Sequence, residues 1–98
     1  MDDQDIFSAL SNPTRRAILA WMKDVPGTFG EVGDAETNEV CVSAVQRKTG
    51  LSQSTVSAYM AALERAGLVS SKRRGQWTFF SRDEGAIAAF AGKISTEL

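Results

Sequence analysis

Residues 50–57 read GLSQSTVS, and this stretch determines how the rest of the sequence is interpreted. Glycine is typical of the position just past a helix end, and Ser52 is a favoured N-cap for a new helix. Apolar residues at i, i+4 and i+7 then mark one face of that second helix: Val56, Met60 and Leu63. Since a short helix with basic residues in its last turn precedes Gly50, the pattern predicts a helix-turn-helix over about residues 42–66.

The outward face of the second helix is polar but almost uncharged in its N-terminal half. It carries Gln53, Ser54, Thr55, Ser57 and Tyr59. A helix that merely faced water would more often carry Glu and Lys, which are better helix formers. Glutamine can bind adenine through two hydrogen bonds, and serine or threonine can bind several bases, so this face is suited to reading the major groove. The alternative is that the serine-rich first turn only caps the helix.

A β-hairpin with a cationic tip is predicted next, over about residues 68–82. Its second half is rich in aromatic and β-branched residues, and its polar tip carries Lys72, Arg73, Arg74 and Gln76. Placed directly after a helix-turn-helix, such a hairpin is interpreted as a wing that contacts the DNA backbone or enters the minor groove. The alternative is that its charges protect edge strands from aggregation.

Two further helices are predicted at the ends of the chain, over about residues 3–10 and 83–96. Their apolar residues lie at helical spacing: Ile6, Phe7 and Leu10 in the first, and Ile87, Phe90 and Ile94 in the last. The last helix either packs on its own domain or forms a dimer contact together with the first. Because the chain has little core left to cover, a dimer contact is the favoured interpretation.

Between these parts the sequence predicts one more helix and one long loop. Asn12 is a good N-cap and Pro13 suits the first helical position, so a helix is expected over about residues 13–23. Residues 24–38 hold three glycines and a proline without an apolar period, which predicts a long loop. Ligand contact and a tolerated insertion are both open roles for this loop.

Length and composition predict one domain over residues 1–98, since 98 residues with 43% hydrophobic content suffice for one modest core. The fold class expected is mainly α with a small β-hairpin, a winged helix-turn-helix of about five helices and a two-stranded wing. The net charge is −1, but residues 43–82 carry seven basic residues against one acid, a net charge of +6. This segment is suited to phosphates, although a solvated charged face is the alternative.

The same composition excludes several classes of protein. There is no histidine, which removes the commonest general base and metal ligand, and the lone Cys41 allows no intrachain disulfide and no four-cysteine zinc site. We therefore expect no enzyme activity, no cofactor and no metal site. The acidic N-terminus is unlike a secretory leader and no apolar run is long enough for a membrane span, which predicts a cytoplasmic protein without membrane contact.

Three stretches together resemble the ArsR/SmtB family of bacterial transcriptional repressors: ALSNPTRRAIL from Ala9, GLSQSTVS from Gly50 and LERAGLV from Leu63. The resemblance spans about residues 5–92. It implies a homodimer held by the first and last helices that binds an inverted-repeat operator in double-stranded DNA and releases it on meeting an effector, whose identity the sequence does not specify. It also matches the polar residues of the second helix to the family's recognition helix and the basic residues of the hairpin to its wing.

The chain departs from the metal-sensing members of that family. Some of those members carry Glu-Leu-Cys-Val-Cys-Asp where residues 39–44 here read EVCVSA, so this chain keeps one of the two thiols. Other members bind the metal through histidines, and this chain has no histidine. We therefore expect metal sensing to be lost. Two roles are open for Cys41: a redox switch, by oxidation or by a disulfide across the dimer, or a small, partly buried side chain.

The function expected is that of a sequence-specific DNA-binding repressor. The alternative is a winged-helix module that binds protein instead of DNA. Such a module would present an apolar or acidic face on its second helix, whereas this chain presents a polar face within a basic segment.

Overall fold

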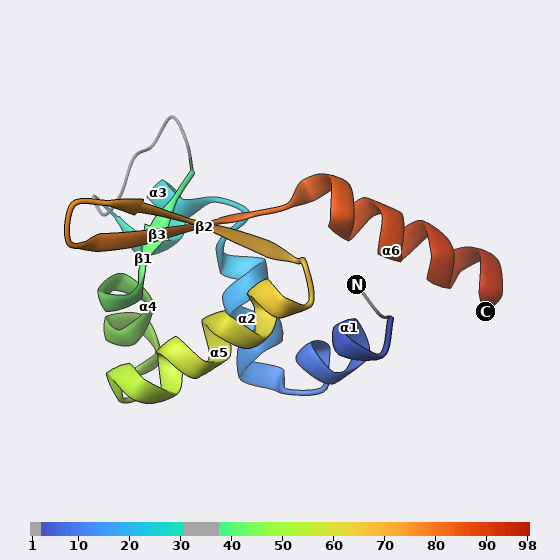
Figure 1. Cartoon of the computed structure of the whole chain (residues 1–98), viewed down its shortest axis with the longest axis horizontal. Coiled ribbons are helices and arrows are strands. Elements are labelled where there is room, and N and C mark those ends of the chain that lie inside the picture. Colours follow the sequence, from blue (N-terminus) through green and yellow to red (C-terminus); the bar gives the residue numbers. More distant parts are fainter. Residues whose placement is uncertain (1–2, 31–37) are drawn as a thin grey trace.

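The computed structural model describes residues 3–30 and 38–98 of the chain (Figure 1). Six helices and a small three-stranded sheet make up this part, in the order α1 (Asp3–Leu10), α2 (Pro13–Trp21), α3 (Val25–Phe29), β1 (Val40–Cys41), α4 (Val42–Thr49), α5 (Gln53–Arg65), β2 (Val69–Arg74), β3 (Trp77–Arg82) and α6 (Glu84–Glu97). The expected class, a mainly helical fold with a small antiparallel sheet, is confirmed. None of the helices in the described ranges is long and apolar enough to cross a membrane.

The helix starts expected from local signals are present as capped ends. The Asn12 side chain accepts hydrogen bonds from the backbone N–H groups of Thr14 and Arg15 and caps α2. The Ser52 hydroxyl accepts from the Thr55 N–H and caps α5. Gly50 follows α4 with a φ of 74°, a left-handed conformation that favours glycine, so the chain turns sharply between the two helices.

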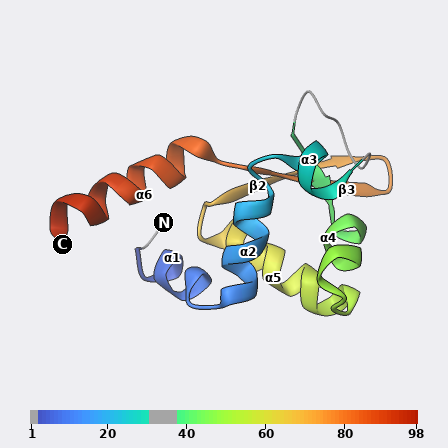
Figure 2. The ribbon, with the colours of Figure 1, turned by 180° about the vertical axis from the view of Figure 1, so that it is seen from behind.

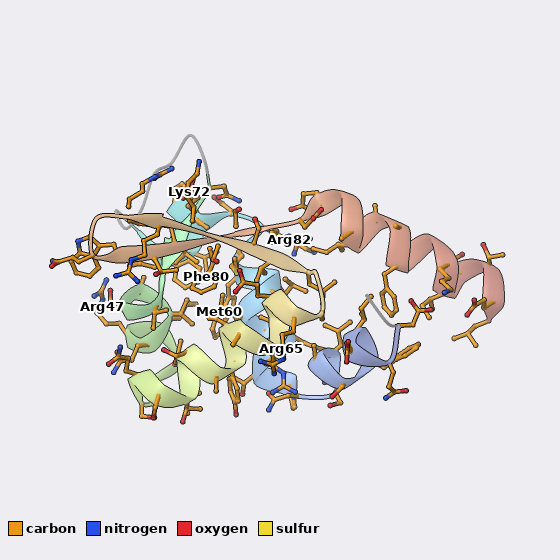
Figure 3. All side chains as sticks on the ribbon, in the orientation of Figure 1. Arg47, Met60, Arg65, Lys72, Phe80 and Arg82 are labelled. Atoms are coloured by element: carbon orange, nitrogen blue, oxygen red, sulfur yellow. The ribbon has the colours of Figure 1, made fainter. Side chains whose placement is uncertain are left out.

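The core lies between the helices and the inner face of the sheet. Val56, Met60 and Leu63 of α5 are fully buried, and they form one cluster with residues of α2, α4 and the hairpin. Figure 3 shows Met60 and Phe80 in the interior between α5 and the hairpin. Helix α5 is therefore held along its apolar face by the core, and this packing holds the polar face of α5 in one orientation.

A short helix, α3, interrupts the region that the sequence predicts as one long loop over residues 24–38. Asp24 caps it, Val25 is buried, and Phe29 packs edge-to-face on Trp21 with ring centroids 6.4 Å apart. The Asn38 amide joins the two ends of the region, since its oxygen accepts from the Val25 N–H and its nitrogen donates to the carbonyl of Met22, the C-cap residue of α2. The prediction of a loop is thus wrong for residues 25–29, and residues 31–37 lie outside the described part of the chain.

A third strand, β1, extends the wing that the sequence predicts as two-stranded. Val40 lies opposite Phe80 and Cys41 lies opposite Phe79, so the strand order is β1-β3-β2. Two residues are too few to show an alternating pattern, and this strand exists only because β3 offers it an edge. It matters for the site because β1 leads directly into α4 and so attaches the wing to the helix-turn-helix.

Helix α6 and the wing tip lie at opposite ends of the long axis of the molecule, as both views of the ribbon show (Figures 1 and 2). None of the residues of α6, all of which the structure describes, is buried in the single chain. The helix is anchored at its start by Arg82, whose guanidinium is nearly buried and donates to the Leu19 carbonyl and to both carboxylate oxygens of Glu84. These hydrogen bonds and the arginine charge lower the pKa of the exposed Glu84 carboxyl.

Arg82→Met should lower the free energy of unfolding by about 1–3 kcal/mol, because the buried Leu19 carbonyl loses its charged donor while the aliphatic stem is kept. Urea unfolding followed by circular dichroism measures the change. Arg47 is an exposed arginine on α4, and Arg47→Met is the control that should change stability by less than about 0.5 kcal/mol. Equal effects of the two substitutions would contradict the anchoring role.

Candidate nucleic-acid interface

The N-terminal half of α5 presents the polar face that the sequence predicts. Gln53, Ser54 and Ser57 are exposed and Thr55 is half-buried. Part of the hydroxyl cluster stabilises the helix itself, since the Ser52 hydroxyl donates to the Thr55 hydroxyl at 2.9 Å and lies 3.2 Å from that of Ser54. Capping therefore accounts for some of the serine-rich turn, whereas Gln53 and Ser57 face outward toward the wing.

Tyr59 is less exposed than its place on the outward face predicts. It is half-buried, its hydroxyl accepts a hydrogen bond from the Asn12 amide at 3.3 Å, and the Arg15 guanidinium lies 5.3 Å from its ring centroid. The amphipathic ring thus packs its apolar body on the core and directs its polar end to the start of α2. Tyr59 joins α5 to α2 and is only partly accessible to a ligand.

The wing divides its basic side chains between its two faces. Ser71 faces α5, because its hydroxyl donates to the Glu64 carboxylate, and Arg73, two residues further along β2, shares that face. Lys72 and Arg74 alternate to the opposite face, and Figure 3 shows Lys72 on the side of the hairpin away from Phe80. The sequence predicts one basic cluster at the tip, whereas in the structure Arg73 is on the face that Ser71 occupies and the other two basic residues are on the opposite face.

Arg74 is engaged in an ion pair. Its Nη2 atom lies 2.8 Å from the Oε1 atom of Glu39, and its guanidinium lies 5.4 Å from the ring centroid of Phe79. Arg73, in contrast, is exposed and its Nε atom donates only to the nearby Gly75 carbonyl among the described groups, at 3.3 Å. The two neighbouring arginines therefore differ in how readily each can turn to a new partner.

A groove of about 420 Å³ lies between the wing, the start of α4 and the N-terminal half of α5. It brings together two residues of the recognition helix, Gln53 and Ser57, and one wing residue, Gln76. Trp77 lines the same groove and is 52% exposed, although the sequence pattern assigns it only a strand role. The sequence could have singled out Trp77, because a large aromatic residue directly after the wing turn stands where no core position is expected.

The comparisons with known proteins agree on one family. A family model described as "Bacterial regulatory protein, arsR family" matches residues 35–71. The HTH-type transcriptional regulator YbzH of Bacillus subtilis is 41% identical over 100 residues, which cover 100% of both chains. The chain belongs to the ArsR family. The family predicted from the sequence is thereby confirmed.

Two solved structures share the fold of this chain. NolR from Sinorhizobium fredii is 29% identical, with a TM-score of 0.65 over 96% of this chain and 81% of that protein. The homodimeric winged helix-turn-helix DNA-binding domain Mb0332 from Mycobacterium bovis is 25% identical, with a TM-score of 0.63 over 96% of this chain and 76% of that one. The winged helix-turn-helix architecture is therefore shared over 96% of the chain.

The residue corresponding to the metal-binding box of some ArsR-family sensors is Cys41, a half-buried free thiol 3.2 Å from the Ser43 hydroxyl. Within residues 3–30 and 38–98, no three histidine, cysteine, aspartate or glutamate side chains are grouped to hold a metal ion. Cys41 also lines the groove between the wing and α5. Both roles left open by the sequence, a redox switch and a small packed side chain, are compatible with this position.

The residues predicted for the dimer contact of this ArsR-family chain lie together on α1 and α6. Phe7 is 48% exposed, and its ring meets Phe90 edge-to-face with centroids 5.4 Å apart. An ion pair between Asp3 and Lys93 joins the same two helices. The remaining apolar members of the set are half-buried, namely Ile6, Leu10, Ile87 and Ile94. Ile6, Leu10 and Ile87 pack against the core of their own chain, so only part of the predicted set is available to a second copy.

Proposed function

We propose that this ArsR-family protein is a dimeric transcriptional repressor that binds an inverted-repeat operator through α5. The observation that carries the proposal is the groove lined by Gln53 and Ser57 of α5 and by Gln76 and Trp77 of the wing. In this proposal α4 and α5 form the reading unit, β2 and β3 form the wing, and α1 and α6 form the dimer contact. Because its partner is chromosomal DNA, we expect the protein to act in the cytoplasm, and we propose no catalytic role.

The chemistry of α5 supports base reading. Gln53 carries an amide that can donate to and accept from adenine in the major groove, and the small Ser57 permits close approach of the helix to the bases. Ser54 and Thr55, with hydroxyls near the helix start, are suited to phosphate or base contacts of lower specificity. Neither an acidic nor a large apolar side chain lies on this face in the described chain, which favours DNA over a protein surface.

The wing supplies the contacts expected for the backbone. Arg73 lies on the same face of β2 as Ser71, which contacts α5, and its exposed guanidinium can bind a phosphate. Lys72 adds positive charge on the other face, which contributes to attraction at longer range. Trp77 offers a flat apolar surface for a deoxyribose. These wing residues lie in the segment with a net charge of +6, which supports binding that depends on salt.

Dimer formation is supported by the exposed apolar surface of α1 and α6 and by the likeness to the homodimeric winged helix-turn-helix domain Mb0332. A hollow of about 240 Å³ between the two helices, lined mainly by Ile6, Phe90 and alanines, can receive a side chain of a second copy. A two-fold axis at this surface relates two α5 helices, which then read successive major grooves about 34–36 Å apart.

Binding to DNA is tested by fluorescence anisotropy with labelled duplexes from the region upstream of the protein's own gene, against shuffled duplexes of equal length. We expect the logarithm of the association constant to fall linearly with the logarithm of salt concentration, and the upstream duplex to bind at least 10³-fold more tightly. A protein that bound neither duplex in a salt-dependent way would contradict the proposal and favour a protein-binding module.

Gln53→Ala should remove discrimination at one base pair in each half-site, worth about 1–3 kcal/mol per pair, because the amide loses its two hydrogen bonds to a base. A panel of operators with single base-pair changes measures the effect. The same variant should bind the shuffled duplex as the wild type does, since Gln53 makes no phosphate contact in the proposal. Unchanged discrimination at every position would exclude Gln53 from base reading.

A further inference from the structure

Glu39 is a buried carboxylate at the entrance to β1. The residue is 6% exposed, its Oε1 atom accepts from Arg74, and its Oε2 atom is buried without a hydrogen-bond partner in the described part of the chain. A buried carboxylate is stable only when it is paired, so Glu39 depends on Arg74.

Arg74 reaches Glu39 by crossing the sheet. It lies on β2, whereas Glu39 adjoins β1, and β3 lies between the two strands. The guanidinium passes over Phe79 of β3, with 5.4 Å between its Cζ atom and the ring centroid. The arginine side chain is 40% exposed, so the pair lies at the outer face of the wing and joins all three strands.

The ion pair opposes the phosphate role that the sequence predicts for Arg74. If Arg74 turned to a DNA phosphate, the Glu39 carboxylate would stay buried without a counter-charge, which is strongly unfavourable. Arg73 can bind a phosphate at far lower cost, since its only described hydrogen bond is to a carbonyl two residues away. The two arginines therefore have different roles.

We propose that Glu39 and Arg74 are positioning residues that fix the wing relative to α5, and that Arg74 does not bind a phosphate. This inference rests on the proposed DNA-binding function. Cys41 at the end of β1 is also the N-cap residue of α4, so a link from β2 to Glu39 attaches the wing to the helix-turn-helix. The pair thereby sets the width of the groove between Gln76 of the wing and Gln53 of α5.

A double-mutant cycle tests the pair with Arg74→Met, Glu39→Gln and the two together. Methionine keeps the aliphatic stem over Phe79, and glutamine keeps the shape of Glu39 without its charge. Arg74→Met leaves a buried, unpaired carboxylate and should weaken operator binding about tenfold, the middle of the range for coupled pairs. The double variant should regain most of this loss, because the neutral amide does not need a counter-charge.

The salt dependence separates positioning from phosphate contact. Arg74→Met should keep the wild-type slope of log K against log salt, whereas Arg73→Met, the matched control, should lower its magnitude by about 0.9 per subunit. Glu39→Gln should not rescue Arg73→Met. The proposal is overturned if Arg74→Met lowers the slope as Arg73→Met does, if Glu39→Gln alone tightens binding, or if the double variant binds no better than Arg74→Met.

A readout without DNA keeps this test separate from that of the proposed function. Trp77 lies opposite Arg74 in the hairpin, and with Trp21→Phe as background it is the one tryptophan of the chain. Its emission maximum and the Tm should shift in Arg74→Met, return toward the background values with Glu39→Gln, and stay unchanged in Arg73→Met. If neither the emission maximum nor the Tm shifted in Arg74→Met, the positioning role of the pair would be overturned even if the protein binds its operator. If the protein bound no DNA, the two measurements would still test the ion pair.

Discussion

Phe90→Lys should convert the protein to a monomer and weaken operator binding about 10²- to 10⁴-fold. Phe90 lies on α6, where its ring packs against Phe7 and lines the hollow between α1 and α6. A lysine ammonium at the centre of an apolar contact loses its hydration, so the two copies separate. The second half-site is then no longer bound at the high effective concentration that a dimer provides, which accounts for the expected loss.

The fold of each chain should survive this substitution, since none of the described core residues belongs to α6. Sedimentation velocity gives the mass, circular dichroism checks folding, and anisotropy gives the affinity for the operator. Ala88→Lys is the control, because Ala88 is exposed on the same helix and a lysine there adds the same charge. A dimer that persisted in Phe90→Lys would place the contact between copies elsewhere.

Local sequence signals predicted the parts of the fold that are specified by neighbouring residues. The first helix was expected over residues 3–10 and is found at Asp3–Leu10, and Ser52 caps α5 as its place before the apolar stripe predicts. Caps, proline positions and apolar spacing act within one or two turns of chain. The winged helix-turn-helix could therefore be recognised from the chain itself.

The parts that were missed depend on residues far apart in the sequence. The start of α3 is held by Asn38, whose amide oxygen accepts from the N–H of Val25 thirteen residues earlier. Strand β1 is formed by pairing with β3. The same reason applies to the candidate nucleic-acid interface, where the sequence predicted which residues take part but not which residues of the same chain they contact. Tyr59 bonds to Asn12 across 47 residues and Arg74 to Glu39 across 35, distances over which periodicity carries no information.

Leu63→Ala should lower the free energy of unfolding by about 2–5 kcal/mol, because it removes a fully buried side chain and leaves a cavity that the surrounding core fills only in part. Leu63 lies on α5 in one cluster with Ile18 of α2 and Leu68 at the start of the hairpin. Domains of this kind have about 5–15 kcal/mol of stability in all, so the loss is a large share of the total.

Leu98→Ala is the matched control, since the same side chain is removed from a position that is 97% exposed. Urea unfolding at a fixed protein concentration should give a clear loss for Leu63→Ala and a change within about 0.5 kcal/mol for Leu98→Ala. Equal stabilities would mean that α5 is not held by this cluster. Because the cluster also orients Gln53 and Ser57, Leu63→Ala should further weaken operator binding at temperatures where the chain is still folded, an effect that Leu98→Ala should lack.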